Sequence, residues 1–155
     1  MLTKEFFDST VKPTVEEFLS CERDIRRGRL AAIVLYHVSA YWQLENKTRY
    51  ERLPILHEFL IGECPDFLLI RDVADVTKHG ELTRPDHPRI PRSVTFADQV
   101  KPAAPGLFHA PFGEGVFAEA SKVTAILNDG KVFILVSAVR SVLSMWERIL
   151  TEHAT

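Results

Sequence analysis

The residues best suited to chemistry lie in one short stretch of the chain, Leu68 to Leu82. Carboxylates and histidine are the side chains that bind divalent metals and transfer protons in acid–base catalysis. The stretch therefore predicts a catalytic or metal-binding site. Its reactive side chains are Arg71, Asp72, Asp75, Lys78 and His79, of which Arg71, Asp72, Asp75 and His79 are the candidate catalytic residues.

A helical conformation of this stretch would bring three of these side chains together. The spacing i, i+3, i+7 places Asp72, Asp75 and His79 on one face of a helix, opposite the apolar arc that would face the core. On the same helix Arg71 is turned aside. A helix face of mixed charge is also typical of plain solvated surface, so the sequence leaves both interpretations open.

The proline-rich segment that follows this helix bears on the choice between them. Thr83 to Gly115 holds six of the nine prolines, so it cannot continue a helix. The segment also carries apolar residues, and we expect it to wrap over the helices. If it folds back, its histidines would join the helical residues in a site with mixed oxygen and nitrogen ligands. The candidate cofactor is a divalent metal, although no HxxxH, HExxH or CxxC spacing is present, and its candidate ligands are Asp72, Asp75, His79, His87 and His109.

Helical periodicity dominates the rest of the chain. One apolar segment, Leu30 to Leu44, is hydrophobic nearly all round, which is typical of the central helix of a bundle. His37 then lies on an apolar face and is interpreted as a core histidine, with a ligand role as the alternative; His57 is interpreted as structural. Together with the Leu68 stretch, the predicted helices are Thr14 to Arg26 with Thr14 as N-cap and Gly28 as stop, Leu30 to Leu44, Pro54 to Gly62, and Val139 to Leu150.

Between the proline-rich segment and the last helix, the sequence predicts a β-hairpin. Val116 to Val136 contains alternating apolar residues around the turn sequence Asn128-Asp129-Gly130. The fold class is therefore α+β, mainly α: a bundle of four to five helices with a long proline-rich loop and one C-terminal β-hairpin. We expect a single domain over residues 1–155. So small a set of strands leaves an exposed edge that could pair across a two-fold axis, and we therefore expect a homodimer.

Composition narrows the classes of partner. Apolar residues make up 46% of the chain and charged residues 26%, as in ordinary globular proteins. The net charge of −2 gives no global attraction for nucleic acid or anionic lipid. Cys21 and Cys64 lack metal-ligand spacing and are expected to be reduced thiols. Since no apolar run approaches the roughly 20 residues that span a bilayer, we expect a cytoplasmic protein with no membrane partner.

The motif Arg71-Asp72…Lys78-His79 resembles that of the HEPN superfamily, whose members are small helical bundles. Many of them act as dimeric ribonucleases, and the resemblance implies that Arg71 and His79 form a catalytic pair beside Asp72. HEPN motifs have a shorter gap, whereas seven residues separate Arg71 from His79 here, which turns the two side chains about 80° apart on a helix. The second half also resembles small bacterial or phage proteins, a likeness that implies no activity.

Three functions follow from these observations. The first is a helical association module of HEPN-like type, without confirmed catalysis, that binds itself, a protein partner or RNA. The alternative is a ribonuclease or metal-dependent hydrolase that uses the Asp72/Asp75/His79 face. A third class, a small-molecule binding protein, depends on Tyr36, Tyr41 and Trp42 and on the phenylalanines of the proline-rich segment, all of which are also typical of core packing.

Overall fold

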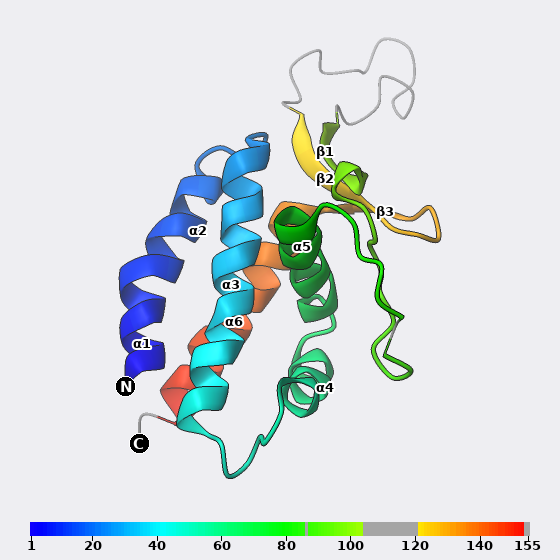
Figure 1. The fold of residues 1–155 in the computed structure, drawn as a ribbon. Coiled ribbons are helices and arrows are strands. Elements are labelled where there is room, and N and C mark those ends of the chain that lie inside the picture. The colour runs from blue at the N-terminus through cyan, green and yellow to red at the C-terminus, as the bar shows by residue number, and fades with distance from the viewer. Residues whose placement is uncertain (86, 104–120, 154–155) are drawn as a thin grey trace, which may run out of the picture.

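The structure is a computed structural model that describes residues 1–85, 87–103 and 121–153. It is mainly helical with one small antiparallel sheet, so the predicted α+β, mainly α fold class is confirmed. The helices pack around an apolar core, and the sheet lies at one end of them (Figure 1). In chain order the elements are α1 (Leu2–Phe6), the π-helical turn η1 (Phe7–Val11), α2 (Lys12–Leu19), α3 (Ile25–Glu45), α4 (Leu53–Glu63), α5 (Phe67–His79), the 3-10 turn η2 (Ala97–Gln99), β1 (Val100–Ala103), β2 (Lys122–Ile126), β3 (Val132–Ile134) and α6 (Leu135–Glu152).

The first eighteen helical residues, Leu2 to Leu19, form a longer helix than the sequence predicts. α1, η1 and α2 continue one another without a break, so Thr14 is not an N-cap; its hydroxyl donates instead to the Thr10 carbonyl at 2.7 Å. The wider π-helical turn comes just before Pro13, which has no N–H to give to a helical hydrogen bond. A helix that widens for one turn in this way can extend through a proline that a sequence pattern takes as a boundary.

The predicted boundary between the first two helices, Thr14 to Arg26 and Leu30 to Leu44, is also wrong. α2 ends at Leu19, and α3 begins after Asp24, whose carboxylate accepts from the backbone N–H of Arg27 at 3.1 Å. Gly28 is therefore inside α3 and does not stop a helix. A Cβ at this position would lie 3.0 Å from Phe18 Cε1 and 3.1 Å from Leu135 Cδ2. Gly28 is explained by close packing against two neighbouring elements.

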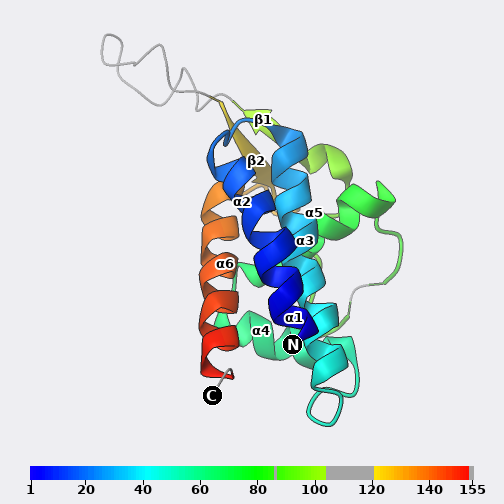
Figure 2. The ribbon, with the colours of Figure 1, turned by 90° about the vertical axis from the view of Figure 1, so that its left-hand side faces the viewer.

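Helix α3 is the centre of the bundle, as its nearly uniform hydrophobicity predicts. It lies between α2 and α5 in Figure 1, and α6 runs behind it. Trp146 of α6 donates its indole N–H to the Leu35 carbonyl of α3 at 3.1 Å in the buried core. Figure 2 shows α6 alongside the N-terminal helix, with both ends of the chain at the same end of the bundle.

The sheet contains the predicted hairpin and one strand that the sequence did not reveal. β2 and β3 pair through the Asn128-Asp129-Gly130 turn, where Gly130 has a φ of 87° that favours glycine. The order is β1-β2-β3, with both pairs antiparallel. β1 falls inside the proline-rich segment, where Pro102 is tolerated because β1 is an edge strand. The predicted start of the hairpin near Val116 lies outside the described residues.

The segment between α5 and β1 folds back over α5, as predicted for the proline-rich stretch. Gly80, with a φ of 76°, ends α5, and its carbonyl accepts from Ala97 N–H at 2.8 Å. The Leu82 N–H donates to the Thr95 carbonyl at 2.9 Å, and Arg29 of α3 holds the Ala97 carbonyl at 3.1 Å. This return brings the residues from Pro91 to Thr95 against the polar face of α5.

Cys21 is half-buried, Cys64 is buried, and both are free thiols. Across the described part of the chain, no helix is both long enough and apolar enough to cross a membrane.

Candidate functional site

The predicted site residues lie on α5, but the face they occupy is covered. The helix begins just after Pro65 and Asp66 and ends at Gly80, close to the predicted boundaries. Its apolar side packs on α3, and its other side receives the returning segment. The side chains of this region therefore meet residues that are about twenty positions further along the chain.

Asp72 is the most completely bonded residue of the site. Its Oδ1 accepts from Arg71 Nε at 2.8 Å and from Arg92 Nη1 at 2.9 Å. Its Oδ2 accepts from the backbone N–H of Ser93 at 2.6 Å and from the Ser93 hydroxyl at 2.8 Å. Each carboxylate oxygen thus has two donors, which is about the full accepting capacity of the group. Asp72 has no exposed surface.

Asp75, one turn further along, shares the same cation. Its Oδ2 accepts from Arg92 Nη1 at 2.6 Å, so one nitrogen of Arg92 bridges both carboxylates. Hydrogen bonds between ionised groups are stronger than those between neutral groups when they are withdrawn from water. The result is a clasp, defined as Arg71, Asp72, Asp75, Arg92 and Ser93, that holds the returning segment on α5.

The clasp corrects two of the sequence predictions. Asp72 and Asp75 do not form an open pair on a solvated face, because the returning segment covers Asp72 entirely and most of Asp75. Arg71 is not turned aside; it is buried beside Asp72, and its Nη2 also donates to the Pro91 carbonyl at 3.5 Å. A helical wheel places side chains relative to their own helix only, so it could not show either result.

His79 and His87 do not join this cluster. His79 is exposed at the end of α5, with a helical rise of about 12 Å between it and Arg71. His87 accepts from the Arg89 N–H in its own turn, at 3.2 Å. Among the residues that the structure describes, no group of three or more His, Cys, Asp or Glu side chains could hold a metal ion. His109 lies outside those residues. The geometry thus gives no support to the predicted metal set.

Next to the clasp is a buried histidine that sequence reasoning treated as structural. His57 of α4 is 6% exposed, and its ring stacks obliquely on Tyr36 at 5.4 Å and on Phe67 at 5.6 Å between ring centroids. Burial, together with the charges of Arg71 and Arg92, lowers the pKa of His57 to about 4. Its Nε2 has no hydrogen bond among the described residues. His57 is therefore a neutral member of an aromatic cluster.

Tyr36 belongs to this aromatic cluster and also lines a groove between α3 and α5. The groove encloses a cavity of about 380 Å³. Burial, followed by the nearby charge of Asp75, raises the pKa of Tyr36 to about 12, so its hydroxyl stays protonated. His37 lines the same groove and is exposed, which corrects its prediction as a core histidine. The apolar part of the lining consists of Ile33, Ala40, Leu53 and Ala74.

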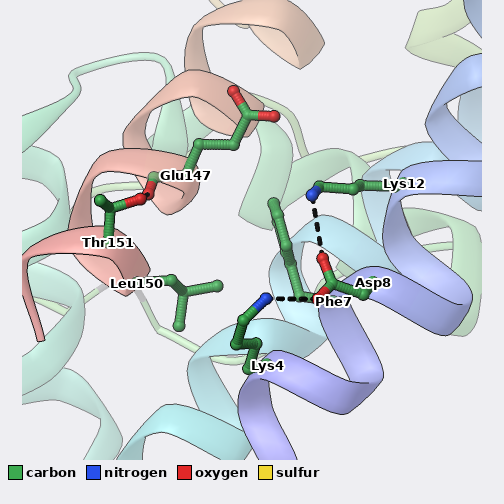
Figure 3. A pocket seen from close by; sticks show the side chains of 7 residues that line it. All are labelled: Lys4, Phe7, Asp8, Lys12, Glu147, Leu150 and Thr151. Carbon is green, nitrogen blue, oxygen red and sulfur yellow. Dashed lines mark hydrogen bonds and ion pairs between the residues drawn. The ribbon is translucent and has the colours of Figure 1, made fainter. Parts of the chain in front are cut away.

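A second groove lies between the N-terminal helix and α6. It encloses about 420 Å³, and Figure 3 shows Phe7 at its centre with Glu147 and Leu150 on the opposite wall. Asp8 bonds both Lys4 and Lys12, and these lysines lower the pKa of its carboxyl. The charged groups of this groove thus pair with one another or face solvent, and we assign the groove no chemical role.

Among the residues that the structure describes, the longest run of exposed large apolar side chains is on β3. Three consecutive residues there have large exposed fractions: Val132 at 61%, Phe133 at 42% and Ile134 at 43%. β3 is at the edge of the sheet, since β2 lies between it and β1. Sequence analysis predicted an exposed edge but did not identify these residues. The uninterrupted sequence Val-Phe-Ile after a turn was the available signal.

Comparison of the chain with family models, with curated proteins and with solved structures gave no match. The resemblance to the HEPN superfamily accordingly stays a prediction. The features of the chain that bear on its function are the clasp, the α3–α5 groove and the β3 edge.

Proposed function

We propose that the chain is an association module of helical-bundle type, and that its β3 strand pairs with β3 of a second copy. The observation that carries this proposal is a strand edge whose three residues are all apolar and all exposed. An apolar edge strand is a template for a further strand, and proteins usually protect such edges with charge, proline or a covering segment. The strand itself, Val132–Ile134, contains no charged residue and no proline.

The backbone of β3 defines how a second strand would bind. Hydrogen-bonded and non-hydrogen-bonded pairs alternate along an antiparallel ladder. The Leu127 N–H donates to the Lys131 carbonyl at 2.8 Å, so the next hydrogen-bonded pair is Ala125 with Phe133. The backbone groups of Val132 and Ile134 then point away from β2. Of these, the N–H and carbonyl of Val132 and the N–H of Ile134 are available to another strand.

A two-fold axis at Phe133 uses these groups without further change. Antiparallel pairing about that axis sets Val132 opposite Ile134 of the second copy, and Phe133 opposite itself. The N–H of Ile134 then donates to the carbonyl of Val132 in the second copy, and symmetry repeats this bond. The Ile134 carbonyl is occupied at the start of α6, because Ile134 is the N-cap of that helix.

The side chains near the axis are compatible with this register. Lys131, the only charged neighbour at that end of the strand, falls opposite Leu135 of the second copy rather than opposite another lysine. Stable interfaces bury at least about 1,000 Å². With so short a strand, we expect a dimer that dissociates at about 10 µM.

The alternative function, a ribonuclease or a metal-dependent hydrolase at Asp72, Asp75 and His79, has less support. Both oxygens of Asp72 are saturated by residues of the same chain, and His79 is directed to solvent elsewhere. A general base or metal ligand needs a lone pair within reach of its target. The carboxylates of the clasp are used to hold the chain together, which favours association over catalysis.

Sedimentation velocity over a concentration series tests the proposed association. The wild-type chain should shift from monomer to dimer as its concentration rises through the micromolar range. Phe133→Lys should remain a monomer, because it sets two like charges face to face at the axis. Ile55→Lys is the matched control, since Ile55 is an apolar residue of α4 with a similar exposed fraction, 44%.

Each possible outcome of this experiment either supports or contradicts pairing through β3. A dimer that Phe133→Lys abolishes and Ile55→Lys preserves supports the proposal. A wild-type chain that stays monomeric at several hundred micromolar contradicts it. A dimer that survives Phe133→Lys also contradicts it, because association would then use another surface.

A further inference from the structure

We propose that the groove between α3 and α5 is a binding site for a small carboxylate with an apolar body, such as a short-chain or medium-chain fatty acid. This inference is independent of association through β3. It combines three features of the groove: an apolar floor, a surplus positive charge and hydrogen-bond donors that are not used within the described part of the chain.

The floor of the groove is apolar and belongs to two packed helices and the start of a third. Ile33 and Ala40 come from α3, Ala74 from α5 and Leu53 from α4. Their small or aliphatic side chains leave a cavity of about 380 Å³. Small-molecule sites typically have volumes from about 300 Å³ upward and apolar walls with a few polar groups. The floor fits an alkyl chain or a small ring.

The charge of the groove favours an anionic head group. Asp75 is the only acid in the lining, and it is paired with Arg92 of the clasp at 2.6 Å. Lys78, one turn further along α5, has no ion pair with any described residue. An ammonium group that is not neutralised beside an apolar cavity attracts carboxylates. Lys78 is thus the surplus charge of the groove.

Two further donors surround the same space. The Tyr36 hydroxyl makes no hydrogen bond to a described residue, and its raised pKa, about 12, keeps its proton in place. The His37 imidazole lines the groove from α3 and is exposed. A carboxylate has two oxygens with about four accepting positions. Lys78 with Tyr36 or His37 can therefore bind one head group while the apolar body lies on the floor.

Titration with sodium octanoate, followed by amide chemical shifts and by calorimetry, tests the proposal. Octanoate should saturate the wild-type chain and shift the amides of α3 and α5 around Tyr36 and Lys78. 1-Octanol and octylamine are the matched neutral and cationic probes, and both should bind at least about tenfold more weakly, since they lack the charge-assisted bonds to Lys78.

Substitutions make the test specific to the groove. Lys78→Gln should weaken octanoate binding about tenfold, and Lys78→Arg should retain most of it. Ala40→Phe should block binding by filling the floor; because Ala40 is exposed, the fold should be preserved. Lys47→Gln, on an exposed lysine outside the groove, is the control and should have no effect.

Several results would overturn the proposal. One is octanol binding as tightly as octanoate, which would show a merely apolar site. Another is equal affinity of the wild type and Lys78→Gln, and a third is chemical-shift changes confined to other elements. Absence of saturable octanoate binding in a folded wild-type chain would also refute it.

Discussion

The polar face of α5 and the edge of β3 differ in whether their hydrogen-bonding groups have partners within the chain. On α5 the carboxylate of Asp72 has four donors and no exposed surface. On β3 the side chains from Val132 to Ile134 are exposed, and the outer backbone groups meet no strand within the described residues. The residues that look reactive in the sequence therefore use their hydrogen-bonding groups to stabilise the fold. Residues that look like ordinary sheet formers carry the surface available for association.

Satisfied groups contribute to stability, whereas unsatisfied groups contribute to binding. A buried carboxylate whose lone pairs all accept hydrogen bonds within the chain has none available to bind a substrate. Its removal would leave the neighbouring cations buried without a counter-charge. An apolar edge strand contributes little to the monomer and gains only when another strand covers it. Substitutions in the two regions should therefore have different signatures.

The largest effect on stability is expected at Asp72. Asp72→Asn removes the charge that compensates Arg71 and Arg92 and gives them a poorer acceptor in a buried place. We expect a loss of about 4 kcal/mol in the free energy of unfolding, measured by urea denaturation, because breaking a buried ion pair typically costs about 3–5 kcal/mol.

Asp75→Asn is the matched control for this substitution. Asp75 has one ion pair within the described residues, to Arg92, and 17% of its side chain is accessible. Its loss should cost about 1 kcal/mol. If Asp72→Asn cost no more than Asp75→Asn, the clasp would not be the main polar anchor of the returning segment.

A somewhat smaller effect is expected from pH at His57. The pKa of His57 is lowered from 6.5 to about 4 in the folded chain. As pH falls below 6.5 the unfolded chain takes up a proton that the folded chain does not, so stability is lost between pH 6.5 and 4. The loss from this group should approach about 3 kcal/mol.

The variant His57→Phe isolates this contribution. It keeps an aromatic ring between Tyr36 and Phe67 but cannot titrate. The difference in the free energy of unfolding between wild type and variant, measured from pH 7 to pH 4, should change in favour of the variant as pH falls. A difference that is independent of pH would show that His57 is protonated in the fold as readily as in the unfolded chain.

The smallest effect on monomer stability is expected at β3. Phe133→Lys should change the free energy of unfolding of the dilute monomer by no more than about 0.5 kcal/mol, because the side chain is already exposed. The melting temperature of the wild type should rise with protein concentration, since association stabilises the folded state. That of Phe133→Lys should not. A large loss of monomer stability would mean that Phe133 packs within its own chain.

Local patterns in the sequence were sufficient for part of the fold. The all-round hydrophobicity of Leu30 to Leu44 identified the central helix, and Asn128-Asp129-Gly130 located the hairpin turn. Both are signals that a few neighbouring residues carry by themselves. The predictions at Pro13 and Gly28 were wrong because a π-helical turn accommodates the proline and packing against Phe18 and Leu135 explains the glycine.

The candidate site was beyond what local patterns could give. The right helix was found, but the partners of Asp72 are Arg92 and Ser93, which lie beyond several prolines. Whether that segment returns to α5 depends on tertiary contacts such as the one between Arg29 and Ala97. A helical wheel therefore places Asp72 on the solvent-exposed face, although the fold buries it. Likewise β3 was recognised as a strand, while its exposure depended on where the sheet ends.

Disulfide trapping at Phe133 tests the central claim, β3 pairing, most directly. With the two-fold axis at Phe133, the two copies of this residue form a non-hydrogen-bonded pair whose Cα atoms are about 4.5 Å apart, within the range that a disulfide accepts. Val132 and its own copy would be about 8 Å apart, which is too far. Phe133→Cys, in a Cys21→Ser background, should oxidise rapidly to a covalent dimer, while Val132→Cys should not. Equal cross-linking of both variants, or none at Phe133→Cys in a chain that dimerises, would contradict the account.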